Sequence, residues 1–476
     1  MRLRKLINIV SVWTACLAAT WRDHPDGRRM VGSLTWLPRA LLRCRTSRPP
    51  ARVPGDVGPC ARVPQTGQAG AVTGIEQRAG SHRLSHLDNL RTALVAWVIG
   101  GHALLGYTVI GGWPYDEVNE VTFAAPTEFV LTTILGPSGI IVIGLLFFIA
   151  GMLSEPAVRR HGARRYVRQR LVWLGVPWLA SAVLIWPASM WLAFNTAGHR
   201  VSFWWVLRHR DPLLDSGSLW FALVLMLFSI MFALGSAWLR RKPAIRSRRP
   251  PRPITTVDLV VAVVAIALSS FVVRLWFPVH SRQVGDLHLW WWPECAGLFA
   301  LGIVVGRRGW ARHVPDRTNL VGRWATLITL ALLPVIALLA GVRNPARGLG
   351  PAFGGWHWQS AVAVIVESTL VVACSIWLVG LAERRLDGGS ERTGHWTRAA
   401  FTAFVIQGPV LIVLASAGRL LSLPAEVKAP LVAVVAIVVC FWIGRLAPVR
   451  FGPSRLGSGG RHSTSAEPEP DAMGAS

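Results

Sequence analysis

The sequence has little charge for its length. Only 16% of its 476 residues are Asp, Glu, Lys or Arg, whereas an ordinary soluble domain has roughly 25%. Negative charge is the scarcer of the two, with 24 Asp plus Glu against 50 Lys plus Arg. Hydrophobic residues make up 52% of the chain, and its mean hydropathy is +0.43. This combination excludes an ordinary cytosolic enzyme, a fibrous protein and a disordered protein. It indicates an all-α, polytopic membrane protein.

Cysteine is also scarce, and several well-known motifs are missing. The six cysteines form neither a Cys-x-x-Cys pair nor a Cys/His spacing suited to a metal. Three of them lie inside apolar segments, where a small packing residue is the plain interpretation: Cys295, Cys374 and Cys440. The sequence contains no Walker loop, no GxGxxG, no HExxH and no GxSxG. We therefore predict no disulfide framework, no metal site and no bound cofactor.

The excess of positive charge has two possible meanings, nucleic-acid binding or membrane topology. Most basic residues lie in short loops between apolar segments, as in membrane proteins that keep Lys and Arg in the cytoplasm. We therefore expect a lipid bilayer, and no nucleic acid, as the partner of this chain.

Ten apolar segments follow one another after about residue 89, each long enough to span a bilayer as a helix. Backbone polar groups cannot stay unpaired in lipid, so helices are the form expected for them. The predicted spans are 90–111, 129–153, 171–194, 219–239, 257–277, 289–306, 322–342, 360–381, 399–418 and 429–448.

Charge alternates between the loops that join these spans. The loop after the second span holds six arginines, whereas the loop after the first holds no Lys or Arg. The same alternation continues along the chain, and it predicts a multi-pass protein of the cell membrane with both termini in the cytoplasm. Outside the membrane part, we expect a disordered basic extension over 1–83 and a disordered tail over 451–476.

Ionisable side chains inside a membrane are costly, so they are the first candidates for function. The candidates within the spans, and two acids near span ends, are Arg91, His102, Arg274, Glu294, Glu367, Asp88 and Asp258. His102 lies thirteen residues after Asn89, which places it roughly 20 Å into a core about 30 Å thick. Its imidazole can accept and donate a proton near neutral pH. The alternative is a histidine that only bonds a neighbouring helix.

Arg91 precedes His102 by eleven residues, close to three helical turns. The two side chains therefore share a face while lying roughly 16 Å apart along the axis. A long anionic molecule that enters from the cytoplasm would suit this pair. The alternative is an arginine that only extends to the membrane interface.

Further arginines precede the third span. Arg168 and Arg170 belong to a basic run whose forked side chains suit phosphate, although a topology signal without a ligand explains most of that run. In the outer halves of the later spans, an ion pair between Arg274 and Glu294 is as plausible as a contact with substrate.

Short motifs in a fixed order resemble the acyltransferase 3 family of integral membrane acyltransferases. The opening Asp88-Asn89-Leu90-Arg91, followed by an apolar stretch and His102, is similar to the family's opening pattern. Residues 147–151 (Phe-Phe-Ile-Ala-Gly) are similar to Phe-Phe-x-x-Ser-Gly, with Ala150 where Ser is common. Arg170-Leu171 with Pro177 resembles the basic run that leads into a helix, although Trp173 stands where Arg is often seen.

Three more motifs lie further along the chain. Residues 219–221 (Leu-Trp-Phe) and 299–302 (Phe-Ala-Leu-Gly), the latter running to Gly309-Trp310, resemble family segments. Residues 403–410 resemble Tyr-Leu-x-His-x-Pro, with Gln407 in the place of His and no Tyr. The resemblance spans roughly 84–450, which we predict to be one ten-helix domain.

The resemblance implies transfer of an acyl group, most commonly acetyl, from cytoplasmic acyl-CoA to a hydroxyl of a carbohydrate or lipid-linked acceptor. In that scheme His102 is the general base and Arg91, with Arg168 and Arg170, holds the donor. Cavity or acceptor contacts would come from Asp88, Trp220, Phe221, Arg274, Glu294 and Gln407.

Two other classes of protein remain open. A transporter or flippase would also use buried His, Arg and Glu side chains as a substrate or proton path. The sequence shows no pairing of its two halves, which transporters often have. A catalytically inactive sensor would explain the departures at Ala150 and Gln407.

Overall fold

The computed structural model describes residues 84–109, 113, 115, 118–210, 213–240, 253–279, 287–339, 350–387 and 391–446. The extension predicted over 1–83 and the tail predicted over 451–476 lie outside these residues. Within them the chain forms helices and loops and contains no β-strand, which confirms the predicted all-α class.

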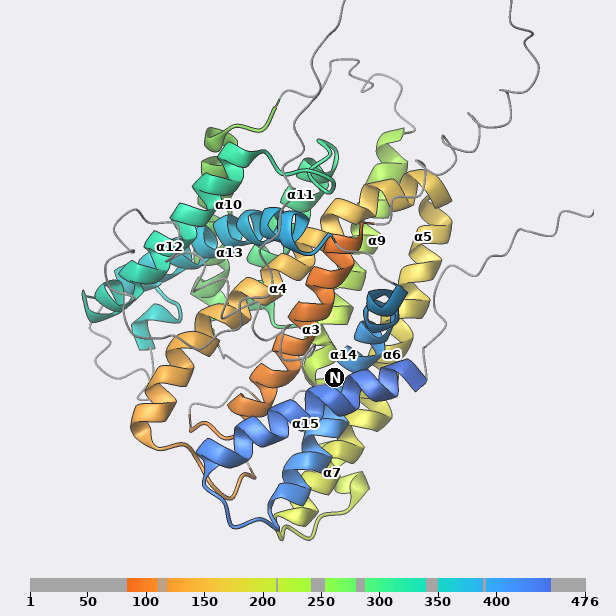
Figure 1. Cartoon of the computed structure of the whole chain (residues 1–476), viewed down its shortest axis with the longest axis vertical. Coiled ribbons are helices and arrows are strands. Elements are labelled where there is room, and N and C mark those ends of the chain that lie inside the picture. Colours follow the sequence, from red (N-terminus) through yellow and green to blue (C-terminus); the bar gives the residue numbers. More distant parts are fainter. Residues whose placement is uncertain are drawn as a thin grey trace, which may run out of the picture. The chain divides into compact units, whose positions relative to one another are not determined.

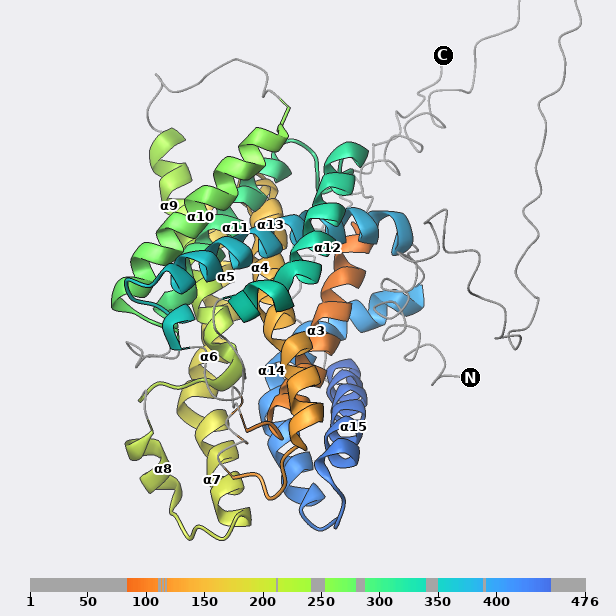
Figure 2. The same ribbon diagram turned by 90° about the vertical axis from the view of Figure 1, so that its left-hand side faces the viewer.

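Thirteen α-helices follow one another along the described residues (Figures 1 and 2). Their bounds are α3 Ser85–Leu105, α4 Ala125–His161, α5 Ala163–Arg170, α6 Val176–Ala180, α7 Trp186–Thr196, α8 Phe203–His209, α9 Trp220–Arg240, α10 Thr256–Trp276, α11 Trp292–Gly306, α12 Asp316–Leu339, α13 Trp358–Arg385, α14 Glu391–Gly418 and α15 Ala425–Leu446.

Nine spans in the described residues are long and apolar enough to cross a membrane, and they confirm nine of the ten predicted segments. The tenth, predicted at 90–111, is the helix α3, and its end at Leu105 corrects the predicted bound. Asp88, Asn89, Arg91 and His102 lower the hydropathy of α3. This helix packs against α4, α13, α14 and α15, so its polar side chains lie among other helices (Figure 1).

Helices α4 and α11 cross closely because glycines replace larger side chains at their contact. A Cβ atom on Gly302 would overlap the carbonyl oxygen of Phe148, and one on Gly151 would overlap that of Phe299. Small residues of this kind let two backbones approach in a membrane. The segments 147–151 and 299–302 therefore meet each other, and their glycines have a packing role.

The third span is a helix with two wider turns. Residues Leu171–Gly175 and Ser181–Ile185 form π-helical turns between α5, α6 and α7. Pro177 and Pro187 follow these turns, and a proline cannot donate the backbone hydrogen bond of a regular helix. The span reaches from Arg170 at one end to Trp186 near the other and so contributes to two parts of the site described below.

Candidate active site

His102 lies on the last turn of α3 and is half-buried. Its Nδ1 atom is 3.1 Å from the Oε1 atom of Gln407, which lies on α14 and is fully buried. The Nε2 amide group of Gln407 donates in turn to the hydroxyl of Ser218, at 3.3 Å. Two sequence candidates, 305 residues apart, are therefore direct partners.

This chain of hydrogen bonds decides which nitrogen of His102 carries the proton. A carbonyl oxygen can only accept, so Nδ1 donates its N–H to Gln407. The lone pair of a neutral imidazole then lies on Nε2. Gln407 thus fixes the tautomer and the orientation of the His102 ring.

An aromatic wall covers one face of His102. The indole of Trp113 stacks on the imidazole with 4.4 Å between ring centroids and 15° between planes. Trp186, from α7, meets Trp113 edge to face at 5.4 Å. Both tryptophans approach Gly408, the neighbour of Gln407, where a Cβ atom would come within 3.0 Å of Trp186 and 4.0 Å of Trp113.

Asp215 fixes Trp186, the second tryptophan of this wall. Its carboxylate accepts from the indole N–H of Trp186 at 2.8 Å and from the backbone N–H of Gly217 at 2.8 Å. Gly217 has φ of +61°, and a Cβ atom there would lie 2.7 Å from the Trp186 ring. Burial raises the pKa of the Asp215 carboxyl, against the two hydrogen bonds, which lower it. Trp186 is therefore held in one orientation by a side chain outside the spans.

The other end of α3 carries the second part of the site. Arg91 lies 3.8 Å from Asp88, one turn earlier, and the charge of Arg170 from α5 also reaches it. The guanidinium of Arg170 sits over the ring of Tyr166, at 4.9 Å. Arg168, in contrast, is exposed. Two of the three predicted donor arginines thus lie near one another on different helices.

The first turn of α3 is fastened to two other segments. Asn89 donates to the carbonyl of Leu386 at 2.8 Å, and a ring nitrogen of His86 lies 3.1 Å from the carbonyl of Ala311. These bonds fix the position of Arg91. Because α3 is unbroken between Arg91 and His102, the two side chains share a face roughly 16 Å apart, as predicted.

Phe221 and Trp220 point to different neighbours. Phe221 contacts Phe147 of α4 at 4.8 Å and Phe404 of α14 at 6.0 Å, one turn before Gln407. Trp220 stacks on His288 at 4.5 Å and on Trp291 at 5.3 Å. Phe221 therefore borders the site, whereas Trp220 packs against the segment before α11.

Arg274 and Glu294 form the predicted ion pair, and Glu367 joins them. The Nη2 atom of Arg274 lies 3.3 Å from Glu294 and 2.6 Å from Glu367. The side chains of Arg274 and Glu294 are only 1% and 2% exposed, and Trp290 lies over the guanidinium at 5.8 Å. This burial favours a structural ion triad that joins α10, α11 and α13 over a contact with substrate.

Four residues that complete the His102 site were not among the sequence candidates: Trp113, Trp186, Asp215 and Ser218. Trp113 falls just beyond the predicted end of the first span, so its return towards His102 carries no sequence signal. Asp215 and Ser218 immediately precede the Leu-Trp-Phe motif at 219–221, and this proximity is the one signal that points to them. Within the described part of the chain, no three His, Cys, Asp or Glu side chains gather to hold a metal ion.

A model of one protein family matches this chain. It is described as an acyltransferase domain, that of acyltransferase 3, and it covers residues 84–445. No curated protein and no solved structure matches the chain. The matched residues include every helix from α3 to α14 and nearly all of α15, and hence all the site residues above.

Proposed function

The chain belongs to the acyltransferase 3 family of membrane acyltransferases, and on that premise we propose that His102 is the general base of an acyl transfer from acyl-CoA to a hydroxyl group. The observation that carries the proposal is the bond between Nδ1 of His102 and Oε1 of Gln407. It leaves the Nε2 lone pair available for the proton of an acceptor alcohol.

His102 alone can account for both proton transfers of this reaction. Nε2 of His102 removes the proton of the acceptor hydroxyl while the oxygen attacks the thioester carbonyl of the donor. The tetrahedral intermediate then releases the CoA thiolate, and the imidazolium returns its proton to that sulfur. The products are an ester and free CoA. A positioned base of this kind contributes roughly 10²- to 10⁴-fold to the rate.

Arg91 and Arg170 would hold the donor. Their positive charges suit the phosphates of CoA, and both lie near the start of α3, the end that we propose to be cytoplasmic because of the arginine-rich loops. The roughly 16 Å from Arg91 to His102 would be bridged by the long, flexible pantetheine arm. Exposed Arg168 would contribute only general attraction.

The acceptor would reach His102 from the opposite side of the membrane. We propose a hydroxyl of a carbohydrate or lipid-linked molecule, with acetyl as the acyl group, in a cell-membrane protein whose two termini are cytoplasmic. The end of α3 near His102 continues into a loop that carries no Lys or Arg, as expected for a loop outside the cytoplasm.

A direct test uses the purified protein in lipid nanodiscs with radiolabelled acetyl-CoA and membrane lipids as the source of acceptor. We expect label to enter a lipid or glycan fraction with release of free CoA. His102→Asn should abolish both while acetyl-CoA still binds. Equal turnover by wild type and His102→Asn would refute the role of His102.

A transporter is the second candidate, because ionisable groups within the spans, such as Arg274 with its two carboxylates, also form proton paths in transporters. The burial of Arg274 and Glu294 counts against it, since it favours a structural role for them. Solute flux into proteoliposomes without any consumption of acyl-CoA would support the transporter. Label transfer without such flux would exclude it.

A further inference from the structure

The loop between α3 and α4 reaches back to His102. We call its described residues 106–109, 113, 115 and 118–124 the Trp113 loop. Trp113 is 4% exposed and is the residue of this loop whose ring stacks on His102. The loop is closed on itself, since Asn119 donates to the carbonyl of Gly106 and the N–H of Phe123 to that of Tyr107, both at 3.1 Å.

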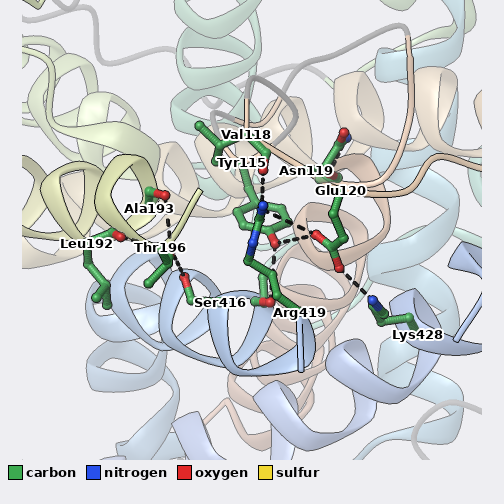
Figure 3. Close-up of polar contacts among 12 residues, drawn as sticks. Tyr115, Val118, Asn119, Glu120, Leu192, Ala193, Thr196, Ser416, Arg419 and Lys428 are labelled. Carbon is green, nitrogen blue, oxygen red and sulfur yellow. Dashed lines mark hydrogen bonds and ion pairs between the residues drawn. The ribbon is translucent and has the colours of Figure 1, made fainter. Parts of the chain in front are cut away.

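The loop is fastened to α14 at two places (Figure 3). The hydroxyl of Tyr115 donates to the carbonyl of Ala415 at 3.2 Å, and Arg419, just after α14, donates to the carbonyl of Val118 at 2.5 Å. Tyr115 is two residues from Trp113 in the sequence, so its bond to Ala415 fixes a side chain of the loop close to the residue whose indole stacks on His102.

The loop is fastened to α15 by an ion pair whose lysine is buried and whose carboxylate is partly exposed (Figure 3). The Nζ atom of Lys428 lies 2.6 Å from Glu120, and Lys428 is 2% exposed. Glu120 also accepts from Tyr115 at 2.9 Å and pairs with Arg419 at 3.5 Å. One carboxylate therefore gathers a lysine, an arginine and a tyrosine from three segments.

The charge state of Glu120 agrees with this arrangement. Burial acts to raise the pKa of its carboxyl, yet the hydrogen bond from Lys428, with that from Tyr115, holds it below its ordinary value. A buried ion pair adds little net stability compared with apolar residues of the same volume, and its best-attested use is to fix a particular arrangement. Lys428 is the single lysine among the described residues, and it serves this contact.

We propose that Trp113 is a positioning residue for His102 and that the contacts of Glu120 with Lys428 and Arg419 hold Trp113 in place. This inference rests on the proposed role of His102. When His102 takes the proton of the acceptor, its ring becomes a cation that faces the indole at 4.4 Å. An aromatic face within about 6 Å stabilises a cation by roughly 0.5 to 2 kcal/mol, with Trp the best and Phe weaker. Trp113 thus both orients the base and favours its protonated form.

A series of variants at residue 113 tests the first half of the proposal. For Trp113→Leu we expect kcat to fall by roughly 2- to 30-fold, and for Trp113→Phe to fall less. The KM for acetyl-CoA should not change, because Arg91 and Arg170 lie at the other end of α3. A purely structural role would instead lower the amount of folded protein and leave the kcat of the remainder unchanged.

Variants at residue 428 test the second half. Lys428→Met should lower kcat in the same way, and Lys428→Arg should restore it because the charge returns. The double variant Trp113→Leu with Lys428→Met should lose no more activity than Trp113→Leu alone, because both changes act through one contact. Thermal unfolding in detergent identifies variants that fail to fold, and Trp113→Phe then carries the test.

The outcomes separate this inference from the proposed function. Wild-type kcat in Trp113→Leu together with an inactive His102→Asn would overturn the role of Trp113 and leave that of His102 standing. Multiplicative losses in the double variant would show that Lys428 acts elsewhere. An active His102→Asn would refute the proposed function itself.

Discussion

The Nδ1 atom of His102 and the Oε1 atom of Gln407 lie 3.1 Å apart, although 305 residues separate them in the chain. The family resemblance places a histidine where Gln407 stands, and an amide cannot titrate as a histidine does. It can, however, accept the hydrogen bond from Nδ1–H and so fix the orientation of the imidazole. The departure at this position therefore fits an active enzyme with one titrating group better than an inactive sensor.

Gln407→Leu removes this acceptor. We expect kcat to fall by about 10-fold, since one hydrogen bond contributes roughly 1 kcal/mol and a buried N–H is left unsatisfied. Gln407→Glu should keep most activity because a carboxylate also accepts from Nδ1. Steady-state kinetics of the two variants provide the measurement, and equal activities in both would contradict the orienting role.

Arg91→Gln should weaken the binding of the donor, acetyl-CoA. A charge-assisted hydrogen bond contributes about 1.5 to 3 kcal/mol, so we expect the Kd for acetyl-CoA to rise by roughly 10- to 100-fold with little change in kcat. Arg168→Gln is the matched control, because that side chain is exposed and should have a small effect. Isothermal titration calorimetry with both variants measures the affinity for acetyl-CoA. Similar losses of affinity in the two would mean that Arg91 does not bind the donor and contributes only to membrane topology.

Gly302→Ala tests the crossing of α4 and α11. The added Cβ would overlap the backbone of Phe148, and we expect a loss of about 1 to 3 kcal/mol of stability. Gly235→Ala, on α9 with no atom within 4 Å of the added Cβ, should leave stability unchanged or raise it slightly. Thermal unfolding in detergent compares the two, and a stable Gly302→Ala would argue against this close packing.

His313 gives a pH dependence outside the spans. Its Nδ1 lies 2.6 Å from Glu383, and that hydrogen bond and the charge of the carboxylate raise the pKa of the imidazole. The unfolded chain releases this proton near pH 6.5, roughly its ordinary pKa. The contact therefore stabilises the fold fully below that pH, and the gain is lost as pH rises through the higher folded pKa.

The corresponding measurement is the midpoint of thermal unfolding against pH for wild type and His313→Gln. We expect a small difference that favours wild type in acid and vanishes in alkali, since His313 is largely exposed. A difference that grows with pH would contradict the assignment.

Much of this architecture could be predicted from apolar run length, because a bilayer demands helices of a set length. Arg91 and His102 could also be placed, since both lie on one uninterrupted helix. Contacts between residues far apart in the sequence could not be predicted. Gln407 stood out only by its place in a motif, and the bond to His102 depends on how α14 packs on α3.

The wall around His102 was beyond prediction for a different reason. Trp113 belongs to the loop that Glu120 joins to Lys428 and Arg419, and these three residues lie on separate segments, so no local pattern in the sequence predicts where the indole lies. The buried partner of Arg274 was foreseen in Glu294, but the second carboxylate, Glu367, joins it only through the packing of α13. Hydrophobic periodicity predicts which residues face inward, but it does not predict which of them contact each other.

The most direct test of the central claim is a single-turnover measurement of acetyl transfer by His102→Gln, with His199→Gln, an exposed histidine, as control. With acetyl-CoA saturating, the account predicts that His102→Gln loses roughly 10²- to 10⁴-fold in rate while His199→Gln keeps the wild-type rate. Equal rates in the two variants would contradict it.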